Sequence, residues 1–588
     1  MRKIVPASVV FLASGLVSAT VHAQSLVTEL ASTGTSDQAA SGSSVYPSIS
    51  LDGIWVAFES DAADLVSNDT NAKSDVFASG RISGTLLRVS VDSNGVEGND
   101  ASTSASISGD GRYVAFASIA TNLVPNDFNS VKDVFVRDTL AGSTVRVSVD
   151  SSGGQSDDWS HAPVMSADGR YVAFASQASN LVLGETNGWV DVFVHDLTTG
   201  VTERVSVDSF GAEANAWSGG GSYPWRTTPI SADGRFVAFA SFASNLVVGD
   251  SNNKWDVFVR DRQAGTTVRA SVSSTGVQGI MESYNPAISA DGRFVAYESF
   301  AFNLVPGDTN NAQDVFVHDL LAGTTIRANL TAAGAQSSFE AREPALSADG
   351  RFISFESNAP DLVPSDLNGD SDVFVRDLSL GVNSLWSVNT ALAQANQPSG
   401  GGTLSGDGLR AAFHSRASNL VTNDLNNSED VFTRGPFFAQ PVLYCTAKVN
   451  SMACLPVMAF IGVVSATQGS GFTLTGSNVM NSKPGLLMYS SAGQLAQPFQ
   501  GGILCVHPPI RRSIGLNSGG SPMPNHDCTG VFSIDMNAYA TGSLGGNPAA
   551  FLTAIGTVVD CQFWGRDPGY PPPANSALTA GLEYTIGS

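Results

Sequence analysis

The sequence predicts an all-β protein, with a seven-bladed β-propeller followed by a small β-sandwich-like C-terminal module. Two residue patterns recur through most of the chain. An Asp-Gly pair returns every 58 residues, apart from one interval of 65, at Asp52, Asp110, Asp168, Asp233, Asp291, Asp349 and Asp407. An Asp-Val-Phe triplet begins 23 residues after each of these aspartates. A fixed period of short β segments and turn residues is typical of a propeller or a solenoid array.

Four short runs in each repeat predict four strands, which we name a to d in chain order. Strand a precedes the Asp-Gly pair and strand b follows it, because such a pair between short apolar runs indicates a hairpin turn. In the third repeat strand b is RYVAFAS (170–176), strand c is DVFVHD (191–196) and strand d is TERVSVD (202–208). Their Val and Phe content suits half-buried strands. Four strands in 58 residues predict one propeller blade with a long b–c loop.

The two ends of the repeat array are complementary. The seventh repeat has strands a, b and c but no clear strand d, while residues 27–33 (VTELAST) precede the first repeat at the offset of a strand d. We therefore expect residues 27–33 to pair with residues 430–434, which closes the ring and protects its edges. An open β-solenoid is the alternative, but it does not need this complementarity.

The repeated residues resemble those of a known family. The patterns S-A-D-G-R-[FY]-V-A-F-x-S and D-V-F-V-[RH]-D are similar to the WD40-like repeats of TolB-type β-propellers, over residues 25–435. The resemblance implies the fold but not a function, because propellers host many unrelated activities. The chain differs from TolB in that no α/β domain is expected before the blades, so TolB's partner is not carried over.

The first 23 residues have the pattern of a secretory signal peptide. Arg2 and Lys3 form its basic start, residues 9–17 its apolar core, and residues 21–23 (VHA) its cleavage site. The core is too short, and too interrupted by Gly and Ser, for a membrane span. We therefore expect a secreted or periplasmic protein, with the propeller in residues 25–435 and the second module in residues 442–588.

The charge is unevenly distributed. The chain has 53 acidic and 30 basic side chains, a net charge of −23. Residues 442–588 hold five of each sign, so the whole net charge lies in residues 1–441. Such a surface repels nucleic acid and anionic lipid, and it suits divalent cations or simple solubility. We expect a monomer with no nucleic-acid partner and no membrane span.

All five cysteines lie in the C-terminal part, at Cys445, Cys454, Cys505, Cys528 and Cys561. Export favours disulfides, and the lack of any Cys-x-x-Cys pair argues against zinc. Four motifs in this part resemble a C-terminal module of secreted proteins from planctomycete-like bacteria: KPGLLMY (483–489), CVHPPIRR (505–512), QFWGRDP (562–568) and LTAGLEYTI (578–586). The resemblance implies disulfides among the first four cysteines and leaves Cys561 as an unpaired thiol.

The b–c loops carry a repeated acidic pattern that makes calcium a candidate ligand. An acid, then an Asn two residues later, then the Asp of Asp-Val-Phe recur, and calcium prefers such oxygen ligands. The alternative is that Asp and Asn cap their own turns, since only three of the six to eight oxygens are visible. The candidate ligands are Asp69, Asn71, Asp75, Asp127, Asn129, Asp133, Asp250, Asn252, Asp256, Asp308, Asn310, Asp314, Asp366, Asn368, Asp372, Asp424, Asn426 and Asp430. The third repeat has Glu185, Asn187 and Asp191.

Aromatic residues concentrate on repeats 2 to 4. Antiparallel strands place the b–c and d–a loops on one face of the ring, which we call the b–c face. Insertions on one face often mark a binding surface, and the interval of 65 results from a seven-residue insertion in AWSGGGSYPWR (216–226). The alternative is that the rings pack on the blades. The candidate ligand-binding residues are Trp189 and Trp255 on b–c loops and Trp159, Trp217, Tyr223 and Trp225 on d–a loops.

Histidines offer little support for a metal enzyme. His195 and His318 occupy a strand c position that is Arg in four other repeats, which indicates a structural layer, paired with the next Asp, rather than a metal set. TolB-like lyases that degrade pectin fragments use a His-rich metal centre, and the seven scattered His do not match it. No nucleophile elbow, zinc-protease helix or phosphate loop is present. No hydrolase domain of alternating strands and helices follows the repeats.

We therefore expect an exported, non-catalytic binding protein that presents a loop face to a protein or glycan at the cell surface. The alternative is a polysaccharide-active enzyme, a lyase or a hydrolase, with its site on the propeller face. No cofactor is expected apart from calcium.

Overall fold

The computed structural model describes residues 26–36, 38–81, 84–219, 228–364, 366–436, 442–444, 447–462, 464, 470–492, 494–500, 502–520, 527–554, 557–568 and 576–586. The expected signal peptide, residues 1–23, lies outside this part. The chain divides into two compact units, Leu26–Pro436 and Phe437–Ser588, the latter with Met1–Ser25. Within the part of the chain that is described, no helix has the length and apolar character needed to cross a membrane.

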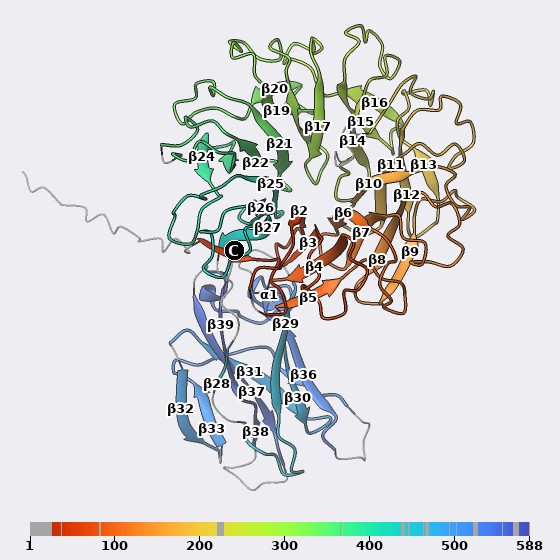
Figure 1. The fold of residues 1–588 in the computed structure, drawn as a ribbon. Coiled ribbons are helices and arrows are strands. Elements are labelled where there is room, and N and C mark those ends of the chain that lie inside the picture. Colours follow the sequence, from red (N-terminus) through yellow and green to blue (C-terminus); the bar gives the residue numbers. More distant parts are fainter. Residues whose placement is uncertain are drawn as a thin grey trace, which may run out of the picture. The chain divides into compact units, whose positions relative to one another are not determined.

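The first unit is a ring of seven antiparallel sheets, which we number as blades 1 to 7 in chain order (Figure 1). Blade 1 consists of β2 (Ser44–Ile49), β3 (Trp55–Ser60), β4 (Asp75–Gly80) and β5 (Thr85–Arg88). Blade 2 consists of β6 (Ser102–Ile107), β7 (Tyr113–Ser118), β8 (Asp133–Asp138) and β9 (Ser143–Arg146). Blade 3 consists of β10 (Ser160–Met165), β11 (Tyr171–Ser176), β12 (Asp191–Asp196) and β13 (Thr202–Arg204). Strands a to d of each repeat are therefore neighbours in one sheet. The seven-bladed propeller is confirmed.

Blades 4 to 7 continue the same order. Blade 4 consists of β14 (Phe236–Ser241), β15 (Asp256–Asp261) and β16 (Thr266–Arg269), and blade 5 of β17 (Ser283–Ile288), β18 (Phe294–Ser299), β19 (Asp314–Asp319) and β20 (Thr324–Arg327). Blade 6 consists of β21 (Ala341–Leu346), β22 (Phe352–Ser357), β23 (Asp372–Asp377) and β24 (Val382–Leu385). Blade 7 consists of β25 (Ser399–Leu404), β26 (Ala411–Ser415) and β27 (Asp430–Pro436) together with β1 (Leu26–Leu30). In blade 4 the place of strand a is taken by isolated bridges of Ser218 with Ser241 and of Ile230 with Val237, on either side of the insertion.

The ring closes through its N-terminal strand, as the sequence predicts. Strand β1 (Leu26–Leu30) pairs antiparallel with β27, with Leu26 opposite Pro436 and Leu30 opposite Phe432. Beyond the backbone ladder, the Ser32 hydroxyl donates to the Asp430 carboxylate over 2.7 Å. The Arg434 guanidinium donates to Thr28 Oγ1 over 2.8 Å. The last blade is thus completed by residues about 400 positions earlier in the chain.

The core of the ring lies between blades. In every blade an aromatic side chain of strand b stacks on the Phe directly opposite it in strand c. The ring centroids of Phe58 and Phe77, for example, are 6.0 Å apart. Small residues of one blade then pack on the large ones of the next, so that Ala57 and Val76 of blade 1 share a cluster with Phe116 of blade 2. Another cluster joins blade 7 to blade 1. Each blade therefore depends on both neighbours for its buried surface.

The predicted structural layer of His195 and His318 is present, but its partner is a different residue. His195 Nδ1 lies 2.8 Å from Thr202 Oγ1 on strand d of the same blade. In blade 2 the equivalent Arg137 donates to the equivalent threonine, Thr144. The following Asp instead accepts from the Arg after Asp-Gly in blades 2 to 6. Neighbouring strands bring these groups together, while residues adjacent in a strand point to opposite faces.

The second unit is a β module with two main sheets. One sheet has the order β28 (Val442–Tyr444), β39 (Gly581–Thr585), β37 (Val558–Arg566), β31 (Pro484–Ser490) and β34 (Arg511–Arg512), with β35 (Leu516–Asn517) and β38 (Ser576–Leu578) at its side. The other has β29 (Val457–Gly462), β30 (Phe472–Val479) and β36 (Gly530–Asp535). β32 (Gln494–Phe499) and β33 (Gly502–Val506) form a hairpin, and α1 (Met536–Ala540) and the 3₁₀ turn Ala550–Thr553 are short. Rings from both sheets share one core, which confirms the sandwich-like fold.

The cysteine chemistry of this unit agrees with a disulfide-bearing module. Cys454 is bonded to Cys528, and Cys505 is also in a disulfide. Cys445 lies outside the described residues. Cys561 is a free and fully buried thiol, and burial raises its pKa well above the ordinary value. This thiol is therefore a core residue and not a reactive group.

Removing the closing strand should destabilise the propeller. A chain that lacks residues 26–33 loses the β1 ladder and the Ser32 bond to Asp430, and it exposes the edge of β27. We expect its melting temperature to fall by at least about 5 °C. In a domain of this size, a loss of 1 kcal/mol in the free energy of unfolding lowers the melting temperature by about 2 °C. Circular dichroism against a control chain that begins at Gln24 measures the effect. An unchanged melting curve would contradict closure by this strand.

Candidate functional site

A buried aspartate begins strand c in each blade and accepts hydrogen bonds from the b–c loop and from strand d or the residues just after it. In blade 4, Asp256 accepts from the Ser271 hydroxyl over 2.5 Å and from the Asn252 amide over 2.7 Å. Asn252 belongs to the D-x-N pattern of the b–c loop, and its amide also donates to the carbonyl of Gly279 over 2.8 Å. The equivalent Asn in the other blades has the same two partners, namely Asn71, Asn129, Asn187, Asn310, Asn368 and Asn426. The Asn is therefore a donor that tethers the loop.

In blades 1 to 5 an arginine at the end of strand d lies between the two acids of the pattern. Arg269 Nη1 is 3.2 Å from Asp250 and 3.1 Å from Asp256, and Arg327 Nη1 is 3.3 Å from Asp308 and 2.8 Å from Asp314. Arg88, Arg146 and Arg204 make the same bridges in blades 1 to 3.

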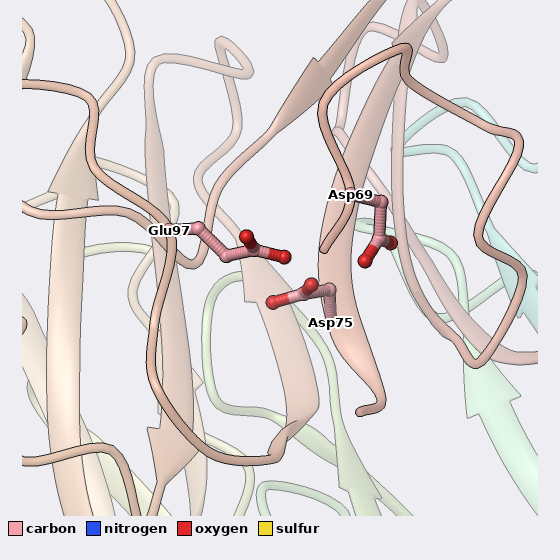
Figure 2. Close-up of side chains that lie close together, drawn as sticks. All are labelled: Asp69, Asp75 and Glu97. Atoms are coloured by element: carbon pink, nitrogen blue, oxygen red, sulfur yellow. The ribbon is translucent and has the colours of Figure 1, made fainter. Parts of the chain in front are cut away.

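Two of these blades contain a third acid. Asp69, Asp75 and Glu97 of blade 1 direct their carboxylates toward one another within 4.8 Å (Figure 2), and Arg88 Nη1 lies 2.5 Å from Glu97. Burial and the charge of Asp75 raise the pKa of Asp69 to about 6. The set Glu185, Asp191 and Glu213 of blade 3 has the same arrangement around Arg204. A guanidinium supplies the cation in both sets.

Blades 6 and 7 have leucine where the other five blades have this arginine. Leu385 faces Phe374 and Leu30 faces Phe432, in the register that pairs Arg269 with Phe258. Calcium therefore stays a prediction, and blades 6 and 7 are the two in which no arginine occupies the space between the acids. In blades 1 to 5 an internal ion pair already neutralises the acids.

The predicted aromatic residues form pairs on the b–c face. Trp189 and Trp217, 44% and 40% exposed, have ring centroids 5.9 Å apart. Trp159 is half-buried against His161 at 4.6 Å, and Trp255 is half-buried 6.0 Å from Phe242, a ring that the sequence prediction omitted. Tyr223 and Trp225 lie outside the described residues. The exposed pair Trp189 and Trp217 is thus the strongest of the predicted contact residues.

The structure adds a site that the sequence prediction missed, a cavity of about 490 Å³ in the central channel. Its walls are the strands a of the blades, with β2, β6, β10, β17, β21 and β25 around the middle of the ring (Figure 1). The third residue of each of these strands is a bulge with φ between 49° and 65°. These bulge residues are Tyr46, Ser104, Ala162, Asn285, Glu343 and Gly401. Bulges re-aim side chains, and all six residues line the cavity.

Acidic side chains in and beside the channel gather on one side of it, while Lys132 of blade 2 also lines the cavity. The penultimate residue of strand b is Glu59, Glu298, Glu356 and His414 in blades 1, 5, 6 and 7, and Ala in blades 2 to 4. Some of these acids have structural partners: Glu59 and Glu298 accept from the bulge N–H of the next blade over 2.8 and 3.1 Å, and Glu356 accepts from Arg342 over 2.7 Å. Glu343 projects from a bulge into the cavity.

The electrostatics confirm that this side of the channel is acidic. Burial, together with the charges of Glu356 and Glu298, raises the pKa of Glu343 to about 7. The pKa of Tyr46 is also raised by burial and by the carboxylates of Glu343, Glu59, Glu429 and Glu356. A group near four carboxylates is in a strongly negative potential, which attracts cations and hydrogen-bond donors.

A sequence signal for this wall exists in the repeat itself. The penultimate residue of strand b is the variable x of F-x-S, and it is Ala in three consecutive blades and Glu or His in the other four. The bulge residue also varies, from Gly and Ala to Tyr and Glu. Both positions lie in otherwise regular strands, so the repeat alone does not show that the bulge residues of six blades line one cavity.

Comparison with known proteins gives similarity of fold only. No family model matches the chain, and no curated protein matches it. Similar solved structures include TolB from Acinetobacter baumannii, with 16% identity and a TM-score of 0.30 over 52% of this chain and 59% of that one. Oligogalacturonate lyase from Vibrio parahaemolyticus has 13% identity and a TM-score of 0.39 over 70% of this chain and 96% of that one. Acylaminoacyl peptidase from Pyrococcus horikoshii has 10% identity and a TM-score of 0.40 over 77% of this chain and 60% of that one. The match therefore spans less than two thirds of that TolB. The propeller assignment depends on the strand order within this chain.

The bridging arginine should be essential for stability. Replacing Arg269 with Leu leaves the buried carboxylates of Asp250 and Asp256 without a counter-charge, which costs about 3–5 kcal/mol. The control is Arg235→Leu in the same blade, which breaks a partly exposed pair with Asp261 and should therefore destabilise the chain much less. Denaturant titration measures both values. Equal effects of the two substitutions would show that the bridge does not stabilise the blade.

Proposed function

We propose that the protein is an exported, non-catalytic binding protein that takes a cationic segment of a partner protein at the b–c face of its propeller. The observation that carries the proposal is the acidic wall of the channel, with Glu343 in the cavity. A Lys or Arg side chain that enters the channel is attracted by the negative potential of this wall. Export follows from the predicted signal peptide and agrees with the disulfides of the second unit.

The aromatic pair on the same face supports this proposal. Trp189 precedes β12 and Trp217 lies in the d–a connection before blade 4, so both are at the b–c ends of their blades. Aromatic rings provide large contact area at low entropy cost, and binding energy concentrates on few such residues. The face therefore combines rings on blades 3 and 4 with acids on blades 5, 6 and 1. Such a division favours a peptide with both apolar and basic side chains over a uniformly charged polymer.

A second candidate is a polysaccharide-active enzyme, a lyase or a hydrolase. One observation favours it: Glu343 has its pKa raised to about 7 beside the carboxylates of Glu356 and Glu298. Two carboxyl groups with different pKa values are the usual acid and base of sugar chemistry. Against it, Glu356 and Glu298 already bind Arg342 and the Glu343 N–H. Turnover of a polysaccharide panel that Glu343→Gln abolishes would favour this candidate.

The acidic wall gives binding a defined pH dependence. Glu343 is largely protonated below its pKa of about 7 and ionised above it. A cationic ligand needs the ionised form, so its affinity should rise about tenfold between pH 6 and pH 8, in proportion to the ionised fraction. Basic peptides identified on an array, titrated into the full chain, measure this change. Glu343→Gln should weaken binding and flatten the pH profile, whereas Glu340→Gln, an exposed acid of the same blade, should do neither.

The aromatic pair can be tested independently. Replacing both Trp189 and Trp217 with Ala should weaken binding of the same peptides at least about tenfold, as expected for central aromatic contacts. Both rings are exposed, so the melting temperature should change little. Replacing Phe210, an exposed ring of a d–a loop, with Ala is the control. Normal binding by the double variant would place the contact surface elsewhere, and unfolding would show that the rings are packing residues.

A further inference from the structure

Blade 7 differs from all other blades in the surroundings of its acidic pattern. Its strand d, β1, has Leu30 where blades 1 to 5 have the bridging arginine. It also has Ala39 where blade 1 has Glu97, since the bridge of Thr33 with Ala39 corresponds to that of Val91 with Glu97. This blade therefore keeps both acids, Asp424 and Asp430, but lacks both of the side chains that surround such acids elsewhere.

The two acids are buried and only partly satisfied. Asp430 is fully buried, with Oδ1 accepting from Ser32 over 2.7 Å and Oδ2 accepting from the Asn426 amide over 2.7 Å. Asp424 is 2% exposed, and its Oδ2 has no hydrogen-bond partner among the described residues. A buried carboxylate without a partner costs several kcal/mol unless a proton or a cation joins it.

The other blades show where a cation belongs. In five copies of the same loop, a guanidinium nitrogen lies between the two carboxylates, for example 3.2 and 3.1 Å from Asp250 and Asp256. The Asn amide and the guanidinium share one oxygen of the strand c aspartate there, over 2.7 and 3.1 Å in Asp256. The matching oxygen of Asp430 can therefore accept a cation in addition to Asn426.

We propose that blade 7 binds one calcium ion between Asp424 and Asp430, at the position that an arginine guanidinium takes in blades 1 to 5. Calcium prefers oxygen ligands and tolerates flexible geometry. Two carboxylates supply up to four oxygens and water supplies the rest. So few protein ligands predict a dissociation constant on the order of 10⁻⁴–10⁻³ M, as in extracellular calcium modules.

Blade 6 does not form a second such site, although it also lacks the arginine. There the Gln394 amide donates to Asp366 over 2.8 Å and to Asp372 over 2.9 Å. This amide bridges the two acids as the arginine does elsewhere, and its N–H groups would repel a metal ion. The proposal therefore requires a stoichiometry of one.

Calcium titration of the full chain tests the site. Calorimetry with calcium chloride should give about one ion per chain, and 10 mM calcium should raise the melting temperature by about 2–4 °C over EDTA. Asp424→Asn should abolish both effects. Leu30→Arg should also abolish them, because it restores the guanidinium. Leu30→Met, which alters the same apolar side chain without adding a charge or a hydrogen-bond donor, is the control and should keep them.

The reverse substitution completes the test. Arg88→Leu in blade 1 leaves Asp69, Asp75 and Glu97 within 4.8 Å without their cation, so the folded variant should bind two calcium ions. If the unchanged protein binds no calcium at millimolar concentration, the two acids of blade 7 share a proton instead and the proposal is wrong. Calcium binding that persists in both Asp424→Asn and Leu30→Arg would also overturn it.

Discussion

The buried aspartate at the start of strand c is the constraint on which each blade depends. One oxygen of Asp256 accepts from Ser271 of strand d, and the other accepts from Asn252 of the b–c loop. In blade 7 the corresponding bond comes from Ser32, so the same interaction also closes the ring. A buried charge is tolerated only when its hydrogen bonds are complete. The conformations of the long loop and of strand d are therefore fixed by one carboxylate.

This constraint creates a second requirement, a positive charge for the pair of acids. Five blades meet it with an arginine, and blade 6 substitutes the amide of Gln394. Blade 7, assembled from both ends of the repeat array, has neither. The difference between blades arises at the junction of the ring, where strand d comes from outside the repeated units.

The regular scaffold also explains why the candidate binding residues lie where they do. The strands a surround the channel, and in the six blades that have this strand its bulge residue lines the cavity. Positions that pack between blades are uniform, as the stacked rings show, whereas positions that face the channel vary from Ala to Glu. Variation at Glu343 and Glu356 changes the channel without disturbing the packing. The acidic wall and the Trp pair are thus features added to a common framework.

The sequence by itself determined the propeller, its seven blades and the strand that closes it, because a strict period of turn residues and a missing strand leave few other arrangements. It also identified the D-x-N loops and the exposed tryptophans as unusual. It could not show that Arg88 and its equivalents enter these loops, because residues 19 positions apart meet only when strands b, c and d pair. The channel wall was equally hidden. Glu343 lies more than 280 positions after Tyr46 and Glu59 in the sequence, and only ring closure places the three around one cavity.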